Sequence, residues 1–572
     1  MPVNRRAIAD ALDSIAALME LRGDNPFRVR AFANGARTVK GLADFDERFA
    51  AGTLLEVKGI GKGLLTEIDA LAATGNSPLL DELEAAVPAG LREIARVAGL
   101  GPKKARTLHD DEGIRSLAEL EYACRENRLS SLKGFGEKTQ RKIRESLAAM
   151  RGREGMLRRD DVRALETLAA DALGAAGGRA VACGAYRRGE TLARGLDLVV
   201  TGKSPEKALG LALEALPVEE LPARDDRGTA RARLLGGAEA RITAVPPGAF
   251  GLALVAATGP EGHARALGRL RAERTGGKQE PLSWPDEEAL YRDLGLPYLP
   301  PEARFEDTDL DALRRDGPPR LLERGEVLGA VHAHTTWSDG SGSVAEMLDA
   351  ARAAGLRWIG MTDHSPTASY AGGLSPERVV EQQEELDREA AARPDLVVFK
   401  GTECDILGDG SLDYGEETLR RFDFLVASVH SLFGKPRDEQ TRRVLRAVGN
   451  PHTTVLGHPT GRLLLGRKGY DLDIPEVLRA CARHGVAVEL NAHPARLDLD
   501  LEWMPLVREL GVAVSIGPDA HETEGFGDLD HGTAVARRAG LPPEQVLNTR
   551  DADGARAFFR ERRRKAGKAG KT

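Results

Sequence analysis

The sequence predicts a multidomain protein with an α-helical N-terminal head, a mixed α/β middle part and a C-terminal β/α barrel of seven strands. Three observations support this fold class. The 572 residues exceed what a single hydrophobic core organises. The first 150 residues form helical patterns separated by glycine-centred turns. From Val327 onward, short apolar segments alternate with helical segments.

The composition is that of an ordinary globular protein, with 41% hydrophobic and 30% charged residues. The cysteines are widely scattered and form no C-x-x-C pair, which predicts a reducing compartment without disulfides or a structural zinc cage. No apolar run approaches the ~20 residues of a membrane helix, and the N-terminus has no apolar stretch typical of a signal peptide. We therefore expect a cytoplasmic protein without membrane contact. The net charge of −7 still permits a local basic surface.

The head contains three similar turns, V-K-G-I-G-K-G at 57–63, V-A-G-L-G-P-K at 97–103 and L-K-G-F-G-E-K at 132–138. Such a hairpin lets a helix N-terminus present free backbone N–H groups to a phosphate, with lysines adding charge. One copy would be an ordinary inter-helix turn as readily as a binding site, but three copies favour contact with the DNA backbone, which positions a duplex without reading its sequence. The residues expected to contact DNA are Gly59, Gly61, Lys62, Gly99, Gly101, Lys103, Gly134, Gly136 and Lys138.

The middle part, residues 151–275, has mixed α/β character. Its strand-like runs are Ala180–Cys183, Leu196–Thr201, Ala230–Leu235 and Ala240–Val245. A helical and proline-rich stretch follows at 276–318, and residues 319–326 after Asp316-Gly-Pro-Pro319 are expected to be a linker.

Residues 327–560 form the predicted barrel. Nearly every apolar segment in it ends in a residue that can bind a metal. The segments are VLGAVHAH, WIGMTDH, VVFKGTE, FLVASVH, TTVLGH, VAVELNAH and VAVSIGPDAH. Apolar strands that alternate with helices predict parallel strands buried on both faces, and active sites of such barrels lie at the carboxyl ends of the strands. Residues 561–572 are expected to be a basic, solvated tail.

A metal centre is predicted at these strand ends. Ten of the twelve histidines follow residue 330. The candidate ligands are His332, His334, Asp339, His364, Glu403, His430, His458, Asp519 and His521. Nine ligands exceed the needs of one ion, so we expect two or three divalent ions, with manganese or zinc favoured and iron as the alternative. A single strand-end histidine is more often an ordinary polar residue. Asp363 and His493 are interpreted in that way, with Asp363 as a candidate partner of a ligand.

These segments resemble the polymerase and histidinol phosphatase (PHP) domain, in the H-x-H-T-x-x-S-D-G, T-D-H, G-T-E, S-V-H, G-H-P and D-A-H motifs. The resemblance implies that Glu403 bridges two ions. It assigns His332, His334 and Asp519 to one ion, and His430 and His458 to the second. Asp339, His364 and His521 would hold a third. Phosphoester hydrolysis is the implied reaction, because divalent ions activate water and stabilise charge on phosphate oxygens.

The first 320 residues resemble a bacterial family X DNA polymerase. The resemblance lies in Gly184-Ala-Tyr-Arg-Arg-Gly-Glu190, Thr258-Gly-Pro-Glu-Gly-His263 and the segment from Tyr291 to Glu302. It implies a DNA-binding helix-hairpin-helix domain at 1–85, a fingers-like region at 86–150, a nucleotidyltransferase palm at 151–275 and a thumb at 276–318, followed by the linker and the PHP domain. The polymerase-site residues that remain are Gly184, Arg187, Arg188 and Asp197.

The palm departs from the family pattern where two-metal nucleotidyl transfer needs carboxylates. The D-x-D position reads Gly195-Leu-Asp197, and Arg241 stands where the third carboxylate is expected. An arginine cannot be neutralised to accept a cation, although Glu190 or Glu239 could in principle reach one. Three further departures are Ala185, Ala256-Ala257 and Ala264. We therefore expect an impaired polymerase site.

Together these features favour a metal-dependent 3′–5′ DNA exonuclease or end-processing phosphodiesterase acting on gapped, nicked or 3′-ended duplex. The resemblance to family X implies a role in DNA repair. One alternative is an active gap-filling polymerase with an auxiliary PHP exonuclease. Another is a small-molecule phosphatase of the histidinol-phosphatase type, although such an enzyme needs no array of hairpins. A non-catalytic DNA scaffold fits least, since all nine ligand positions are filled.

Overall fold

The structure is a computed structural model that describes residues 5–569 except 43, 98–99, 130–131, 152–154, 220–222, 226–227, 236 and 276–282. The chain divides into two compact units. The first comprises Met1–Cys124 and Ser131–Leu147, and the second comprises Arg125–Ser130 and Ala148–Thr572. Within the described residues, none of the helices combines the length and hydrophobicity that crossing a membrane requires.

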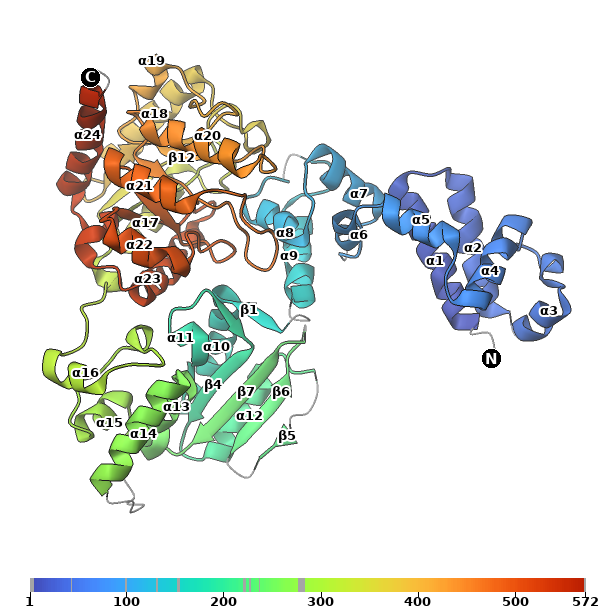
Figure 1. Cartoon of the computed structure of the whole chain (residues 1–572), viewed down its shortest axis with the longest axis horizontal. Helices are drawn as coiled ribbons and strands as arrows, with labels where there is room; N and C mark the ends of the chain where they lie inside the picture. The colour runs from blue at the N-terminus through green and yellow to red at the C-terminus, as the bar shows by residue number, and fades with distance from the viewer. Residues whose placement is uncertain are drawn as a thin grey trace. The chain divides into compact units, whose positions relative to one another are not determined.

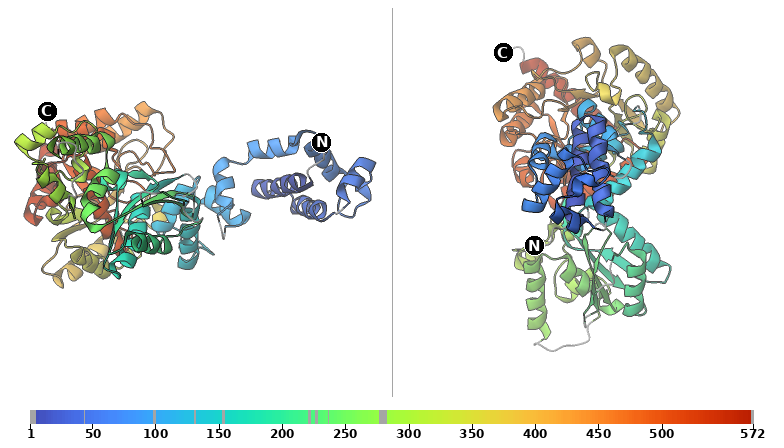
Figure 2. Two further views of the ribbon diagram at one scale, coloured as in Figure 1. Left: turned by 90° about the horizontal axis from the view of Figure 1, so that it is seen from below. Right: turned by 90° about the vertical axis from the view of Figure 1, so that its right-hand side faces the viewer.

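The described part of the first unit is helical, as predicted (Figures 1 and 2). Its α-helices are α1 (Arg5–Arg22), α2 (Pro26–Gly41), α3 (Phe45–Ala51), α4 (Lys62–Thr74), α5 (Pro78–Ala86), α6 (Ala89–Ala95), α7 (Pro102–Arg106), α8 (Leu117–Arg125) and α9 (Glu137–Arg151). The apolar residues of α1 recur at helical spacing, and Leu12, Ile15 and Met19 are fully buried. Helix α1 packs against α2, α4, α5 and α7, so it forms the centre of this unit.

The middle part of the second unit contains a five-stranded sheet. In spatial order its strands are β2 (Arg179–Ala182), β4 (Leu196–Thr201), β7 (Glu239–Val245), β6 (Thr229–Arg233) and β5 (Ala223–Arg224). Only β4 and β7 are parallel. The four predicted strands are confirmed with shifts of one or two residues at their ends. Helices α10 (Arg159–Gly174) and α12 (Pro205–Ala215) pack on the sheet in one apolar cluster, and α13 (Phe250–Thr258) packs on it in another (Figure 1).

Small elements complete this region. The short strands β1 (Met156–Arg158) and β3 (Leu192–Arg194) pair with each other. The other helices are α11 (Gly184–Arg187), α14 (Glu261–Thr275), α15 (Glu287–Asp293) and α16 (Leu310–Asp316). The predicted linker is packed rather than extended, because Leu322 is fully buried in the core of the C-terminal part and its carbonyl accepts a hydrogen bond from Arg537.

The C-terminal part has parallel strands in two sheets. A three-stranded sheet has the order β10 (Val397–Lys400), β9 (Trp358–Met361) and β8 (Gly329–Val331). The five-stranded sheet has the order β11 (Glu403–Asp405), β12 (Val426–Ser428), β13 (Val455–Leu456), β14 (Ala487–Asn491) and β15 (Val514–Gly517). Two single parallel bridges, Ala333 with Ala520 and His364 with Glu403, connect residues of the two sheets.

Helices follow most of these strands. They are α17 (Val344–Ala353), α18 (Pro376–Ala391), α19 (Glu416–Leu419), α20 (Arg437–Gly449), α21 (Ile474–His484), α22 (Met504–Glu509), α23 (Leu529–Arg538) and α24 (Ala552–Ala569). Local sequence sets their ends: Ser343 and Glu346 form a capping box at α17, and α21 ends at Gly485 in the left-handed conformation.

Three details differ from the sequence expectations. The run Val397–Glu403, predicted as one strand, is divided into β10 and β11 at Gly401, whose missing side chain leaves room for the ring of Phe424. His332 and His334 lie just beyond β8 rather than on it. The segment expected to be a solvated tail begins inside helix α24, where Arg562 is buried and donates hydrogen bonds to the carbonyls of residues 448, 450 and 453.

Candidate metal centre

The candidate ligands lie at the ends of parallel strands, most of them on the loops that follow these strands. His332 and His334 follow β8, His364 follows β9, and Glu403 opens β11. The other four loop ligands, His430, His458, Asp519 and His521, follow β12, β13 and β15. The left-handed backbone conformation of His332, His458 and Asp519, at φ of 80°, 22° and 52°, is rare for residues with a side chain and is typical of functional sites.

The structure brings all nine predicted ligands together. Their donor atoms form four overlapping groups in which every atom lies within 4.8 Å of the others. The groups are His334, Asp339, His364 and His521; His332, Glu403 and His458; His332, His334 and Asp519; and His364, Glu403 and His430. The spacing along the sequence could not show this proximity, which arises because the strand ends meet at one end of the sheets.

Glu403 is the central member of the cluster. Its two carboxylate oxygens lie within 3.7 Å of ring nitrogens from five histidines, His332, His334, His364, His430 and His458. The shortest of these distances is 2.8 Å, to Nε2 of His458. Burial raises the pKa of Glu403, but the neighbouring histidines outweigh it and hold the pKa well below its usual range. A carboxylate with this arrangement can bridge two cations.

Two buried carboxylates that the sequence analysis missed orient the ligand histidines. Glu489 Oε1 lies 2.5 Å from Nδ1 of His332, and its other oxygen accepts the backbone N–H of His458 at 2.6 Å. Asp405 Oδ1 lies 2.6 Å from Nδ1 of His430. Each contact directs the opposite ring nitrogen, Nε2, toward Glu403, as partners of metal-binding histidines do. Two features of the sequence could have indicated these carboxylates. Glu489 stands inside the apolar strand V-A-V-E-L, and Asp405 comes two residues after Glu403, on the same side of a strand.

Asp363 supports the loop that carries Asp339. It accepts hydrogen bonds from Thr335 N–H at 2.8 Å, from Ser338 Oγ at 2.5 Å and from Gln382 at 2.6 Å. His493 is buried, and its Nδ1 accepts the backbone N–H of Ala495 at 3.2 Å. Both residues therefore have structural contacts, in agreement with their interpretation from the sequence.

The buried donor atoms fit metal ions. Several of them have no hydrogen-bond partner among the described residues, which is costly for a buried polar atom. They are His332 Nε2, both ring nitrogens of His334, Asp339 Oδ2, His364 Nδ1, His458 Nδ1 and His521 Nε2. Divalent cations would satisfy such a mixed imidazole and carboxylate set, and zinc, manganese and iron all accept it.

In the predicted palm, the carboxylate of Asp197 forms an ion pair with Arg241. Asp197 on β4 and Arg241 on β7 are direct neighbours in the sheet, and Nε of Arg241 lies 2.8 Å from Asp197 Oδ1. Gly184 lies against the same carboxylate, since a Cβ there would be 2.7 Å from Asp197 Oδ2.

Arg187 and Arg188, which the resemblance places in the polymerase site, contact other protein groups. Arg187 forms an ion pair of 2.6 Å with Glu287, whose side chain is 3% exposed, and also contacts Thr258. Arg188 donates to the backbone carbonyl of Thr258 and forms an ion pair of 2.8 Å with Glu190.

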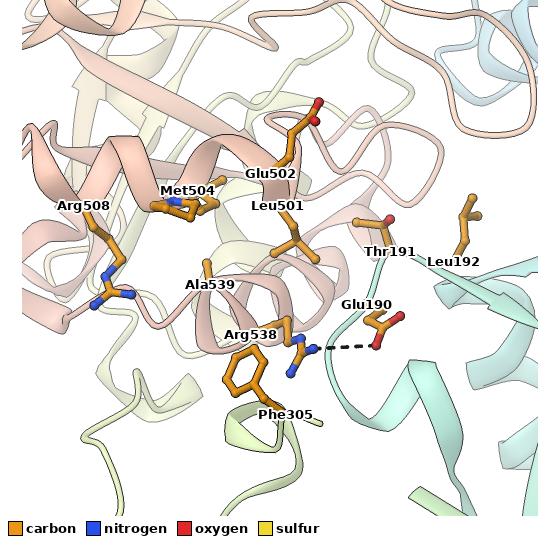
Figure 3. Close-up of a pocket in the computed structure, with 11 residues that line it drawn as sticks. Glu190, Thr191, Leu192, Phe305, Leu501, Glu502, Met504, Arg508, Arg538 and Ala539 are labelled. Carbon is orange, nitrogen blue, oxygen red and sulfur yellow. Dashed lines mark ion pairs between the residues drawn. The ribbon is translucent and has the colours of Figure 1, made fainter. Parts of the chain in front are cut away.

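Glu190 is directed toward the C-terminal part of the second unit. Its carboxylate lies 3.9 Å from Arg538 at the wall of a cavity of about 670 Å³ (Figure 3). Phe305, with Arg538 stacked on its ring, and Arg508 of α22 also line this cavity. The carboxylate of Glu190 therefore lies near two arginines, Arg188 and Arg538.

The three hairpins of the first unit repeat one arrangement. The apolar residue between the two glycines, Ile60, Leu100 or Phe135, is buried at 4%, 3% and 1% exposure. The residues expected to contact DNA face solvent around it, namely Gly59, Gly61, Lys62, Gly101, Lys103, Gly134, Gly136 and Lys138. Gly59 and Gly134 have φ values of 102° and 92°, which glycine adopts without strain. Gly99 lies outside the described residues.

Family models match three parts of the chain. A helix-hairpin-helix domain matches residues 3–77, a SAM-like helix-hairpin-helix tandem matches 91–149, and a PHP domain matches 330–493. The last match ends before Asp519 and His521, which the structure places in the same cluster as the other ligands.

Relatives fall into two kinds. The DNA polymerase/3′-5′ exonuclease PolX of Bacillus subtilis is 31% identical over 98% of this chain and 100% of its own length. A probable phosphatase of Thermoanaerobacter sp. is 29% identical over 41% of this chain and 96% of its own length. A probable phosphatase of Acetivibrio thermocellus is 31% identical over 38% of this chain and 89% of its own length.

Proposed function

Because this chain belongs to the PolX family, whose Bacillus subtilis member is a DNA polymerase/3′-5′ exonuclease, we propose that it is a metal-dependent DNA end-processing enzyme. Its principal active site would be the cluster around Glu403, which would remove nucleotides or end groups from 3′ termini of gapped, nicked or 3′-ended duplex. The single observation that carries this proposal is the clustering of nine candidate ligands, in which five histidines surround the carboxylate of Glu403.

The centre would bind two or three divalent ions, manganese or zinc, with iron as the alternative. These ions would supply an activated water and stabilise charge on the phosphate oxygens. The chain itself would hold the ions in place through Glu403 and would orient the histidine rings through Glu489 and Asp405. We propose the ligand assignment in which Asp519 serves one ion, His430 a second and His521 a third. We also propose that β8–β15 form one seven-unit barrel in which β10 and β11 count as one strand, supported by the two bridges between the sheets.

The DNA-binding role of the head is supported by the exposed glycines and lysines of its hairpins and by the two helix-hairpin-helix matches. These contacts would hold the phosphate backbone without sequence preference. The proposed function in DNA repair rests on the resemblance to the family. We retain the expected domain boundaries, with the head and fingers-like region at 1–150, the palm and thumb at 151–318 and the PHP domain at 327–560.

We further propose that the polymerase site is impaired. The ion pair between Asp197 and Arg241 places a cation where two-metal transfer needs a carboxylate, and Arg187 is committed to Glu287. An active gap-filling polymerase with an auxiliary PHP exonuclease is the first alternative, favoured by the name of the Bacillus subtilis relative. A small-molecule phosphatase is the second, favoured by the probable phosphatases that match the C-terminal part.

One experiment separates these activities. The protein, with Mn²⁺, is incubated with a 5′-labelled primer annealed to a template, with and without nucleotides. Wild type, Asp197→Ala and His334→Ala are compared. We expect shortened products that are lost in His334→Ala and retained in Asp197→Ala, without extension. Extension that Asp197→Ala abolishes would contradict the impaired palm. Turnover of small phosphomonoesters without any action on DNA would replace the proposal with the phosphatase.

A further inference from the structure

Residues 125–129 are an unexpected neighbour of the metal centre. The chain before and after Arg125–Ser130 belongs to the first unit, but this short segment belongs to the second. It begins at the last residue of α8 and turns at Asn127, whose φ of 51° is a left-handed conformation that asparagine tolerates. Neither the sequence motifs nor the proposed function uses this segment.

Contacts within the second unit hold the segment at both ends. Arg125 forms an ion pair of 2.6 Å with Asp160 of helix α10. Arg128 places its guanidinium 4.0 Å from the centre of the Tyr370 ring. Leu129 is 1% exposed. Buried, charge-paired contacts of this kind fix the backbone that carries the residue between them.

Glu126 is that residue, and it is 6% exposed. Its two carboxylate oxygens have different neighbours. Oε2 lies 3.6 Å from Arg128, and Oε1 lies 4.0 Å from Nε2 of His521. The same ring nitrogen lies 3.4 Å from Asp339 Oδ1 and has no hydrogen-bond partner among the described residues. The buried imidazole of His521 is therefore flanked by two carboxylates.

Arg128 compensates part of the charge of Glu126, but Asp339 and Asp519 bring further negative charge to the same imidazole, so a metal ion would lower the cost of burying these carboxylates. Zinc and similar ions bind nitrogen and oxygen ligands at about 2.0–2.2 Å, so one ion can contact two atoms that are up to about 4.2 Å apart. The 4.0 Å between Glu126 Oε1 and His521 Nε2 meets this condition for that pair. Glu126 lies outside the group of His334, Asp339, His364 and His521, whose donor atoms are all within 4.8 Å of one another, so its carboxylate would move toward the ion on binding.

We propose that Glu126 is a tenth ligand of the metal centre, serving the ion of the group His334, Asp339, His364 and His521. This inference rests on the proposed function, since it requires a metal in that group. It adds a ligand from outside the PHP domain. Binding of that ion would then depend on residues 125–129, which lie between the second and third hairpins in the sequence. The metal centre would be complete only when this segment packs beside His521.

Metal content tests the proposal without relying on activity. Wild type, Glu126→Gln, Arg125→Ala, Asp339→Asn and the exposed control Glu384→Gln are loaded with Mn²⁺ and dialysed against graded concentrations of a chelator. Bound metal is then measured by mass spectrometry. Because Glu126→Gln keeps the shape of the side chain and removes its charge, we expect one ion per chain to bind at least tenfold more weakly, with the others unchanged. Arg125→Ala should weaken the same ion by a smaller factor, and Glu384→Gln should match wild type.

The variants also distinguish the possible failures. If Asp339→Asn loses one ion and Glu126→Gln retains it with wild-type affinity, the tenth ligand is refuted and the proposed function stands. If wild type holds no ion, or Asp339→Asn loses none, the metal centre of the proposed function fails as well. Circular dichroism and thermal unfolding establish that each variant is folded. A folded Glu126→Gln that loses all ions together would refute the assignment to a single ion.

Discussion

Asp197 and Arg241 lie side by side on the parallel strands β4 and β7 and form an ion pair of 2.8 Å. Burial raises the pKa of Asp197, and the arginine opposes this shift. The side chains are 27% and 50% exposed, so the pair contributes only about 0–1 kcal/mol to stability. In the proposed function its importance is chemical, since it would neutralise a carboxylate that the family X resemblance assigns to the polymerase site.

Restoring both missing carboxylates should not restore polymerase activity. Gly195 has a φ of 72°, and a Cβ there would lie 2.3 Å from the backbone oxygen of Glu239. We expect Gly195→Asp/Arg241→Asp to lose about 1–3 kcal/mol of stability and to show no primer extension. Denaturant unfolding and extension assays measure this. Arg241→Asp alone should stay within about 1 kcal/mol of wild type. Extension by the double variant would refute the claim that the backbone excludes the second carboxylate.

Replacing Glu489 should weaken part of the metal centre. Its carboxylate lies 2.5 Å from Nδ1 of His332 and accepts the backbone N–H of His458, so it orients ligands assigned to two ions. We expect Glu489→Gln to bind those two ions about 10–100-fold more weakly and to leave the ion near His521 unchanged. Chelator competition measures each affinity, and Glu384→Gln is the surface control. Equal loss of every ion would show a general collapse instead of this selective effect.

Metal binding should release protons. Burial lowers the pKa of His430, but Glu403 and Asp405 outweigh it and raise the pKa to about 10 in the metal-free centre. Likewise, burial lowers the pKa of His521, whereas Asp339 raises it to about 10. Metals bind neutral imidazole, so affinity should rise about tenfold per pH unit for each proton released. Calorimetry in buffers of different ionisation enthalpy counts these protons, and Asp405→Asn should release fewer.

The same shifts predict how the metal-free protein responds to pH. Histidines whose pKa is higher in the folded than in the unfolded state stabilise the fold fully below about pH 6.5, and this stabilisation is lost as pH rises toward about 10. The midpoint temperature of thermal unfolding of the metal-free protein should therefore fall as pH rises across this range. A metal affinity that does not change with pH would contradict the charged state of these histidines.

The hairpin lysines should govern the salt dependence of DNA binding. Lys62, Lys103 and Lys138 are exposed beside the hairpin glycines. Each phosphate contact contributes about 0.9 to the slope of log affinity against log salt, so the triple alanine variant should reduce the slope by about 2.7. Fluorescence anisotropy with duplex DNA at several salt concentrations measures it. The double variant of Lys203 and Lys207, exposed in the palm, is the control. An unchanged slope would mean that the hairpins are only structural turns.

Much of the metal centre could be predicted from the sequence because its ligands follow apolar strands. Strand ends of a parallel sheet lie at one edge, so histidines after β12 and β13 must be neighbours wherever the strands pair. Glu489 was missed because a glutamate within a strand carries no sign of which side chain it contacts. Arg187 was expected in the polymerase site, and the sequence did not indicate that it contacts Glu287, a residue 100 positions further along the chain.

The sequence by itself predicted the parallel strands and the nine candidate ligands, since local periodicity and residue chemistry indicate them. Only the tertiary structure decided which groups meet. It placed Glu403 among five histidines, paired Asp197 with Arg241 and brought Glu126 to His521. The reason is that contacts between distant residues depend on packing and on the pairing of buried charges, which the local sequence pattern does not predict.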